Sequence, residues 1–600
     1  MQDINKKNKD TIRNQIIKHL KNKKPQLISK IKINTNNLSN IFQGIDPKIE
    51  EGIKDTIDLN SWDTSNVINM NHMFFESKLK FNISKWDTSN VTDMSYMFSF
   101  NTNFNDDINT KYIENESYLA WDTSNVTNMS NMFRDTIFNY DINKWNTSKV
   151  TNMEAMFYNN HEFNKNINTE LVHFDVPYLS KLQNKNYNAW NTSNVKNMNH
   201  MFHLAKKFNG IIKDWDVKNI TQMKYIFADT DFFEQDISNW NTINVQNMNA
   251  MFSNSKKFKS DISNWDTSNV TDMNGLFSDA KNFDSDISKW NTSNVTNMRA
   301  MFQGAEIFKK SINTKTENKN GNEYIAWDTI NVTDMSYMFN GANLFNSDLN
   351  NWNTSNVIDM NNMFTEAFEF EKDISDWNTS NVIDMSHMFD NAKKFDCNIN
   401  TREVSKKGDT YTAWDTSNVK KMNLMFQFAL KFNKDLNKWI TRNVITMNGM
   451  FSGAVLFNSD ISKWNTSNVI DMSNMFQLAT NFNQNINTKI VNNNGNVYFA
   501  WDTSNVKNMN HMFSSSYFDG DIGFWNLDKL ATMMDMFFDN QSFDLSKLNT
   551  KPFLNNGRLK HIAWNIIPNL VIHNIDIIEN NLNWNDNNID NFKSKKNYKI

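Results

Sequence analysis

Aspartate recurs at one position of a repeated pattern and is the first candidate for chemistry in this chain of 600 residues. Carboxylates stacked about 5 Å apart repel one another unless water or a cation screens them. We expect water to solvate these carboxylates. The alternative is that Asp236, Asp261 and Asp286 bind calcium. Further members of the column, kept as ligand-binding candidates, are Asp348, Asp373, Asp435 and Asp460.

Groups suited to catalysis are sparse and do not cluster in the sequence. One column of four different repeats holds His72, His200, His387 and His511, which predicts a surface stripe and not a ligand cluster. No Ser/His/Asp set, Gly-rich phosphate loop or carboxylate pair stands outside the repeat background. The single cysteine, Cys397, excludes an intramolecular disulfide and a zinc site built from several thiolates. The sequence therefore predicts no catalytic residue, no cofactor and no enzymatic activity.

Five insertions are the least repetitive part of the chain. Each begins with Ile-Asn-Thr and closes with Tyr, any residue, Ala and Trp. Three have polar, Gly-containing tips that favour two-residue hairpin turns. The ligand-binding candidates in these tips are Asn320, Gly321, Lys407, Asp409, Asn494 and Gly495. The alternative is that the insertions are tolerated surface loops, because lengthening a loop costs little free energy.

A repeat of 24 or 25 residues must position these residues. It is present in seventeen copies, each of which contains one Trp at the same position. Phe occupies one column in every copy, and 32 of the 34 Met residues lie in two columns before it. A single copy cannot bury such a face alone, so neighbouring copies must stack around a shared core. The predicted core is represented by Trp265, Met273, Phe277, Trp290, Met298 and Phe302.

Asn precedes the Val/Ile position in fifteen of the seventeen copies, as at Asn269 and Asn294. A stacked row of amides can donate to and accept from the backbone of its own turn and of the adjacent one. We interpret this row as a structural ladder and not as a binding site.

One complete copy reads FKSDISNWDTSNVTDMNGLFSDA, from Phe258 to Ala280. The apolar spacing from Val270 to Phe277 predicts a short helix, with capping oxygens in the four residues before it. The segment from Asp261 to Trp265 is read as a short strand. Each copy is therefore expected to fold as strand, turn and helix.

These residues carry a family resemblance. The phrase WDTSNVTDMSYMF, from Trp86 to Phe98, with Phe104-Asn105 and Asp107-Ile108-Asn109 after it, resembles the repeat of the BspA-like leucine-rich-repeat surface proteins, also described as the bacterial surface protein 26-residue repeat. The resemblance implies a leucine-rich-repeat-like α/β solenoid of about seventeen strand-turn-helix units. Parallel strands would form one face and helices the other, with five hairpin-like insertions. It also implies a surface-exposed adhesion protein of bacteria.

The composition limits the partners and the domain plan. A net charge of -4 gives no global basic field, so nucleic acid is not an expected partner. No stretch approaches eighteen apolar residues, so no integral membrane segment is expected. We expect a basic helical cap over residues 1–56, in which Ile12, Ile16, Ile17 and Leu20 cover the open end of the array. The alternative is an arm that binds a membrane surface or nucleic acid. The repeat array is expected over 57–549, and a C-terminal cap or tail over 550–600.

The leading hypothesis is an extended, monomeric recognition scaffold at the bacterial surface or in contact with a host. It would bind a protein or glycan through its strand face and insertions. The rival is an intracellular interaction scaffold, or an effector secreted without a cleavable signal. It is motivated by the lack of a recognisable signal peptide or lipidation cysteine near Met1, which leaves a cytoplasmic location open.

Overall fold

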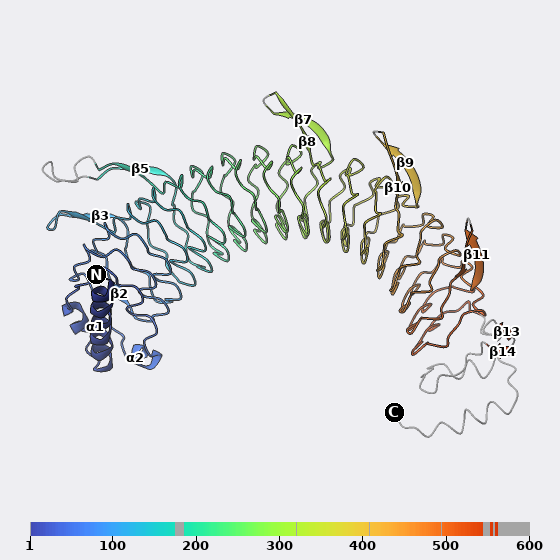
Figure 1. Ribbon diagram of the computed structural model, residues 1–600, viewed down its shortest axis with the longest axis horizontal. Helices are drawn as coiled ribbons and strands as arrows, with labels where there is room; N and C mark the ends of the chain where they lie inside the picture. Colours follow the sequence, from blue (N-terminus) through green and yellow to red (C-terminus); the bar gives the residue numbers. More distant parts are fainter. Residues whose placement is uncertain are drawn as a thin grey trace, which may run out of the picture. The chain divides into compact units, whose positions relative to one another are not determined.

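The computed structural model describes residues 2–174, 185–319, 321–406, 408–493, 495–543, 552–555 and 558–561. The chain divides into two compact units. The first comprises residues 1–332 and 341–347, and the second comprises residues 333–340 and 348–600. Within each unit, successive repeats lie side by side as irregular coils (Figure 1).

In the described residues, regular secondary structure lies at the N-terminal end, in the insertions and in one hairpin after the repeats. The helices are α1 (Gln2–Lys21), η1 (Pro25–Lys30) and α2 (Pro47–Glu51). None of the helices in the described part of the chain is long and apolar enough to cross a membrane. The strands are β1 (Ile57–Asp58), β2 (Phe81–Asn82), β3 (Lys111–Ile113), β4 (Tyr118–Ala120), β5 (Glu170–Val172), β6 (Tyr187–Ala189), β7 (Lys315–Lys319), β8 (Asn322–Ala326), β9 (Arg402–Lys406), β10 (Asp409–Ala413), β11 (Lys489–Asn493), β12 (Asn496–Ala500), β13 (Pro552–Asn555) and β14 (Arg558–His561).

The predicted leucine-rich-repeat-like α/β solenoid is wrong. Over the described residues, the only helices are α1, η1 and α2, all of which precede the first repeat Trp, so no face of the repeats is helical. The expected face of parallel strands is also missing. In the same residues, β1 and β2 are the only named strands that pair in parallel, and every other sheet is a two-stranded antiparallel hairpin.

The predicted repeat helix is a series of tight turns. Leu276 N–H donates to the carbonyl of Met273 three residues back, at 3.2 Å, but Gly275 and Phe277 N–H donate into the next repeat. Gly275 has φ of +61°, a left-handed conformation that a right-handed helix cannot contain. Successive three-residue turns give the same apolar spacing as a helix, which explains why the spacing alone was misleading.

The predicted repeat strand is also a turn. Asp261 Oδ1 accepts the backbone N–H of Ser263 at 3.0 Å, which folds the chain back on itself ahead of Trp265. In the described residues after β2, parallel pairing between repeats consists of isolated bridges of one residue, such as the bridge from Asn247 to Asp272. Each coil is therefore held to its neighbour by alternate backbone N–H groups, without a continuous strand.

The core consists of aromatic columns that run from repeat to repeat. The fully buried Phe277 ring stacks on Phe252 at 5.9 Å and on Phe302 at 5.8 Å, and it contacts Phe283 at 3.7 Å. The Nε1 of Trp265 donates to a backbone carbonyl of the preceding repeat at 3.2 Å, which satisfies the one polar atom of its ring. The structure buries all the predicted core residues, which are Trp265, Met273, Phe277, Trp290, Met298 and Phe302.

The asparagine row forms hydrogen bonds between repeats. Asn269 Nδ2 donates to the carbonyl of Ile243 at 2.7 Å, and Asn294 makes the equivalent bond at 2.7 Å. Where the row carries lysine, Lys529 Nζ donates instead to the side-chain oxygen of Asn505 at 2.6 Å. The row therefore satisfies backbone carbonyls in successive turns, as a structural ladder would.

The N-terminal helix packs on the first coil. Arg13 Nη1 donates to the carbonyls of Asn40 at 2.7 Å and Ile41 at 2.9 Å. Stacking already begins before residue 57, because Asn37 bridges to Asn69 in parallel. The apolar face of the helix is buried through Ile12, Ile16 and Leu20. The predicted segment beyond residue 549 lies outside the described residues, apart from the backbone of β13 and β14.

Candidate binding surface formed by the hairpins

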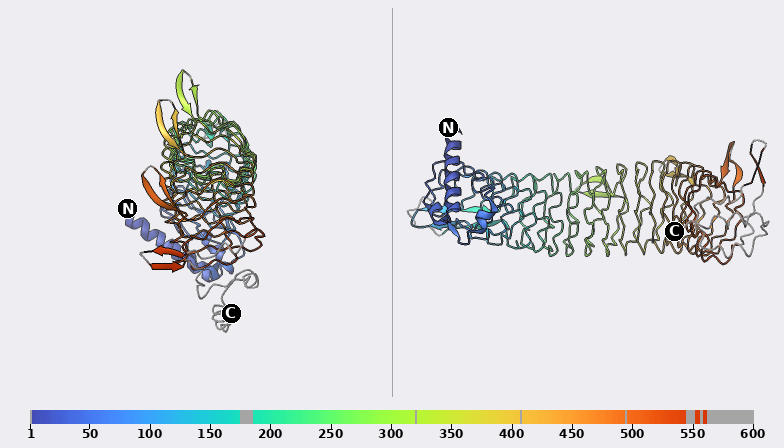
Figure 2. Two further views of the ribbon diagram at one scale, coloured as in Figure 1. Left: turned by 90° about the vertical axis from the view of Figure 1, so that its right-hand side faces the viewer. Right: turned by 90° about the horizontal axis from the view of Figure 1, so that it is seen from below.

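The five insertions are antiparallel hairpins, as the sequence predicted: β3–β4, β5–β6, β7–β8, β9–β10 and β11–β12. Each leaves its coil directly before the repeat Trp, and Figure 2 shows β7–β8 and β9–β10 projecting outward from the coils. In the last three hairpins the closing residue pair leaves a turn of two residues. Their Gly321, Gly408 and Gly495 have φ of +87°, +93° and +88°, which such turns require.

The predicted ligand-binding residues of the tips are only partly visible. Gly321, Asp409 and Gly495 are exposed at the ends of the three hairpins, where a partner could reach them. Asn320, Lys407 and Asn494 lie outside the described residues. The three described tip residues are therefore accessible to a partner. Their role in binding stays a prediction.

Two hydrogen bonds anchor the base of each hairpin. A Tyr hydroxyl donates to a backbone carbonyl of the preceding coil in all five, at 2.7 Å in the last three, from Tyr118, Tyr187, Tyr324, Tyr411 and Tyr498. A Thr hydroxyl donates across the base to the carbonyl of the repeat Trp, from Thr110, Thr169, Thr314, Thr401 and Thr488. Burial raises the pKa of the Tyr324, Tyr411 and Tyr498 phenols further above neutral pH, where the phenol is protonated and can donate.

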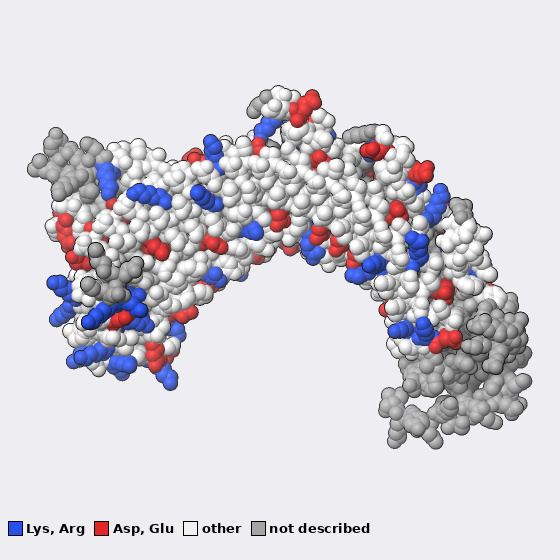
Figure 3. Space-filling view, viewed as in Figure 1, with Lys and Arg blue, Asp and Glu red and all other residues white. Residues whose placement is uncertain are grey.

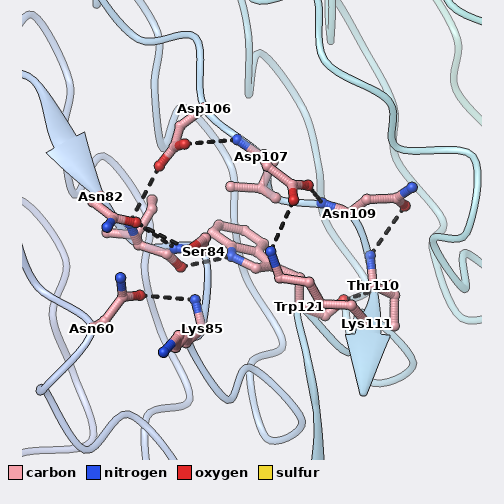
Figure 4. Close-up of polar contacts among 12 residues, drawn as sticks. Asn60, Asn82, Ser84, Lys85, Asp106, Asp107, Asn109, Thr110, Lys111 and Trp121 are labelled. Carbon is pink, nitrogen blue, oxygen red and sulfur yellow. Dashed lines mark hydrogen bonds and ion pairs between the residues drawn. The ribbon is translucent and has the colours of Figure 1, made fainter. Parts of the chain in front are cut away.

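Figure 4 shows the Thr anchor and its neighbours at the base of β3–β4. Thr110 Oγ1 donates to the carbonyl of Trp121 at 2.8 Å, and Lys111 Nζ pairs with Asp107 at 2.8 Å. Trp121 Nε1 in turn donates to a carbonyl of the preceding coil at 2.9 Å. The hairpin is thus tied to the same aromatic column that holds the repeats together.

Removing one anchor should loosen one hairpin without affecting the core. We expect Tyr498→Phe to weaken the attachment of β11–β12 by about 1 kcal/mol, because one hydrogen bond is lost while the ring packing remains. Hydrogen exchange in β11 and β12 should then be roughly fivefold faster. Tyr517, which is 54 % exposed, provides the matched control, and equal effects of Tyr498→Phe and Tyr517→Phe would contradict the anchoring role.

The outward faces of the hairpins differ in chemistry. In β11–β12, Ile490, Val497 and Phe499 are 68 %, 62 % and 50 % exposed, and Ile490 pairs directly with Phe499 across the strands. In β9–β10 the corresponding face is polar and consists of Glu403, Ser405, Thr410 and Thr412. A constant base combined with a variable outward face is what recognition loops on a rigid support require.

The aspartate column forms turns. Asp236, Asp261, Asp286, Asp373, Asp435 and Asp460 each accept a backbone N–H two residues further on, at 2.9–3.1 Å. Asp348 lies 3.9 Å from Lys372 Nζ. The backbone donors at Ser238 and Ser288 hold the pKa of Asp236 and Asp286 below the usual range. No group of three or more His, Cys, Asp or Glu that could hold a metal occurs among the described residues.

Two histidines form a contact that the sequence reading missed. His200 Nδ1 lies 3.0 Å from His203 Nδ1, and His203 Nε2 lies 3.3 Å from Asp229 Oδ2. The repeat column of His200 predicts a surface stripe, and His203 lies outside that column. The three-residue spacing of His200 and His203 was the available signal, because a tight turn brings such side chains to the same side.

Cys397 is buried, with 8 % of its surface exposed. Burial raises the pKa of its thiol to about 12, so the reactive thiolate is scarce at neutral pH. The thiol donates to Asp373 Oδ1 at 3.3 Å, and it has a packing role in its repeat.

Charged side chains of both signs are interspersed over the face shown in Figure 3. Many form pairs between neighbouring repeats, for example Lys207 with Glu162 at 2.8 Å and Lys281 with Glu306 at 2.7 Å. Exposed pairs of this kind stabilise a protein little, typically by about 0–1 kcal/mol. Stacking of the repeats therefore relies on the aromatic columns and the backbone hydrogen bonds.

Stacked aromatic columns and anchored hairpins define a repeat protein. The model of a family described as "Mycoplasma protein of unknown function, DUF285" matches residues 36–169, 173–263, 233–325, 313–413, 403–499 and 491–559. Because these matches cover most of the chain, it belongs to the DUF285 repeat family. No curated protein matches it.

Proposed function

We propose that the protein is an extended recognition scaffold that binds a protein or glycan ligand through its hairpins, at a bacterial surface or in contact with a host. The observation that carries the proposal is the contrast between the hairpin bases and their outward faces. Each base repeats the same Thr anchor to the core, whereas the outward faces change from apolar in β11–β12 to polar in β9–β10.

Rigid attachment favours binding. A loop that is already held in place loses little conformational freedom when a ligand binds, so more of the contact energy appears as affinity. Tyr324 and Tyr498 fix their hairpins to a coil whose core is fully buried, and therefore fix the direction of each outward face. The columns of Trp, Met and Phe that the coils repeat are buried, so they are not available to contact a ligand.

The surface location rests on sequence similarity. The resemblance to BspA-like surface proteins supports display outside the cell, and the DUF285 match supports a repeat protein. The proposed activity is binding, and the proposal assigns no chemical step to any residue.

Protease treatment of intact cells that produce this chain tests the location. We expect external trypsin to remove the protein while a cytosolic marker enzyme stays intact, because lysines such as Lys319 at the β7 end are exposed. Protection of the chain until the cells are lysed would contradict the surface assignment and support an intracellular scaffold.

A further inference from the structure

We propose that His200 and His203 form a binding site for a transition-metal ion of the Zn²⁺ class, with the Nδ1 atoms of both rings as ligands. The site lies in the first unit and does not involve the hairpins. Its proposal is independent of the recognition function, so either can fail without the other.

The two ring nitrogens are already close to the spacing that a metal requires. His200 Nδ1 and His203 Nδ1 are 3.0 Å apart. Two nitrogens bound to a tetrahedral Zn²⁺ at about 2.0–2.1 Å lie roughly 3.3 Å from each other. A ring rotation that opens the pair by a few tenths of an ångström would therefore admit the ion in place of the hydrogen bond.

The backbone presents both rings on the same side. His200 has φ of +59°, and Phe202 between the two histidines is fully buried in the aromatic column, so the turn directs the His side chains outward. The His200 ring stacks on Tyr225 with centroids 4.8 Å apart and planes 7° apart. These contacts hold the rings in position before any ion arrives.

Asp229 supplies the outer partner that histidine ligands of metals usually have. Its Oδ2 lies 3.3 Å from His203 Nε2, and its Oδ1 accepts a hydrogen bond from Asn254 at 2.7 Å. A carboxylate at Nε2 keeps the proton on that nitrogen and leaves Nδ1 as the free electron-pair donor. The arrangement therefore leaves Nδ1 of His203 free to bind a metal. Within the pair, His200 donates its Nδ1 proton to that atom, so a bound ion requires this proton to be released and His200 to carry its remaining proton on Nε2.

The charges around the pair have both signs. Arg134 lies over the Tyr158 ring at 4.4 Å and pairs with Asp135 at 3.1 Å. Arg134 and Lys224 place positive charge near His200. The nearby cations oppose a metal ion and Asp229 favours it, from which we expect an affinity in the micromolar range.

The ligand set selects the class of metal. Imidazole nitrogens suit Zn²⁺, Cu²⁺ and Ni²⁺, whereas Ca²⁺ and Mg²⁺ prefer oxygen. The described residues contain no group of three or more candidate metal ligands, so His200 and His203 would provide two positions and leave the others to water or to a ligand from a partner.

Zinc titration of the full chain in competition with a chromogenic chelator tests the proposal. We expect one micromolar site in the native protein that His200→Gln or His203→Gln weakens at least tenfold. Asp229→Asn should weaken it about tenfold through the loss of the outer carboxylate. His387, whose Nδ1 faces Asp390 at 3.0 Å without a second histidine, is the matched control, and His387→Gln should change nothing.

Electron paramagnetic resonance with Cu²⁺ alone gives an independent readout on the unmodified protein. One equivalent of Cu²⁺ should show coupling to two nitrogen nuclei. Coupling to a single nitrogen, or equal zinc affinity in the native protein and the His200→Gln/His203→Gln double variant, would overturn the site and leave a pair that shares only a proton. Circular dichroism of each variant ensures that a lost site is not a lost fold.

Discussion

Phe277→Ala should destabilise the first unit by about 3–5 kcal/mol, the largest effect on stability that we expect of a single substitution. The Phe277 ring is fully buried and contacts aromatic rings on both neighbouring repeats, at 5.9 Å and 5.8 Å. Its removal opens a cavity between three coils and interrupts the aromatic column. Denaturant titration of the native and variant proteins measures the loss.

The damage should remain local, because stability in a repeat array is close to a sum of local and nearest-neighbour terms. Hydrogen exchange should rise in the repeat of Phe277 and in the two repeats beside it. Phe232, which is 48 % exposed, is the matched control, and Phe232→Ala should cost less than about 0.5 kcal/mol. A uniform rise in exchange over all repeats, or equal costs of the two substitutions, would contradict this account of the core.

Much of the molecule could be predicted from residue columns. The Trp, Met and Phe columns predict a stacked core, and the structure buries residues such as Trp290 and Met298. The Asn row predicts contacts between turns, and Asn294 Nδ2 makes one. The Gly-containing tips predict two-residue turns, as found at Gly495. In each case a single requirement selects the residue type: burial for the aromatic columns, hydrogen bonding for Asn and a positive φ for Gly. The residue type therefore predicts the local structure.

The backbone path of the repeat could not be predicted in the same way. A three-residue apolar spacing fits both a helix and a series of tight turns, and the deciding fact is the left-handed φ at positions such as His200 and Gly275. Because residues as different as His, Tyr, Ala and Gly occupy that column, composition does not reveal the conformation. The same conformation brings His200 to His203. The sequence therefore does not predict the histidine pair as long as this segment is interpreted as a helix.

Shortening three hairpins should weaken ligand binding by an order of magnitude or more, roughly 1.4 kcal/mol. The variant replaces β7–β8, β9–β10 and β11–β12 with the plain 25-residue repeat and keeps every core column. The expected cause is the loss of the outward faces, including the exposed Ile490 and Phe499, while the coils that supported them remain stacked.

A second variant tests the aspartate column in the same assay. This variant removes four negative charges of the column through Asp348→Asn, Asp373→Asn, Asp435→Asn and Asp460→Asn. The substitutions also keep a side-chain oxygen that can accept the hydrogen bond of the turn. This variant should fold and bind the ligand with unchanged affinity. A tenfold loss here, with the hairpin variant unaffected, would place the binding surface on the aspartate column.

The most direct test of the hairpin proposal is a binding titration that compares the native chain with the triple hairpin variant. The ligand is the protein or glycan that the native chain captures from surface extracts. Circular dichroism should first show that both chains retain the same fold. We predict a dissociation constant at least tenfold higher for the variant, and equal dissociation constants in two folded proteins would contradict recognition by the hairpins.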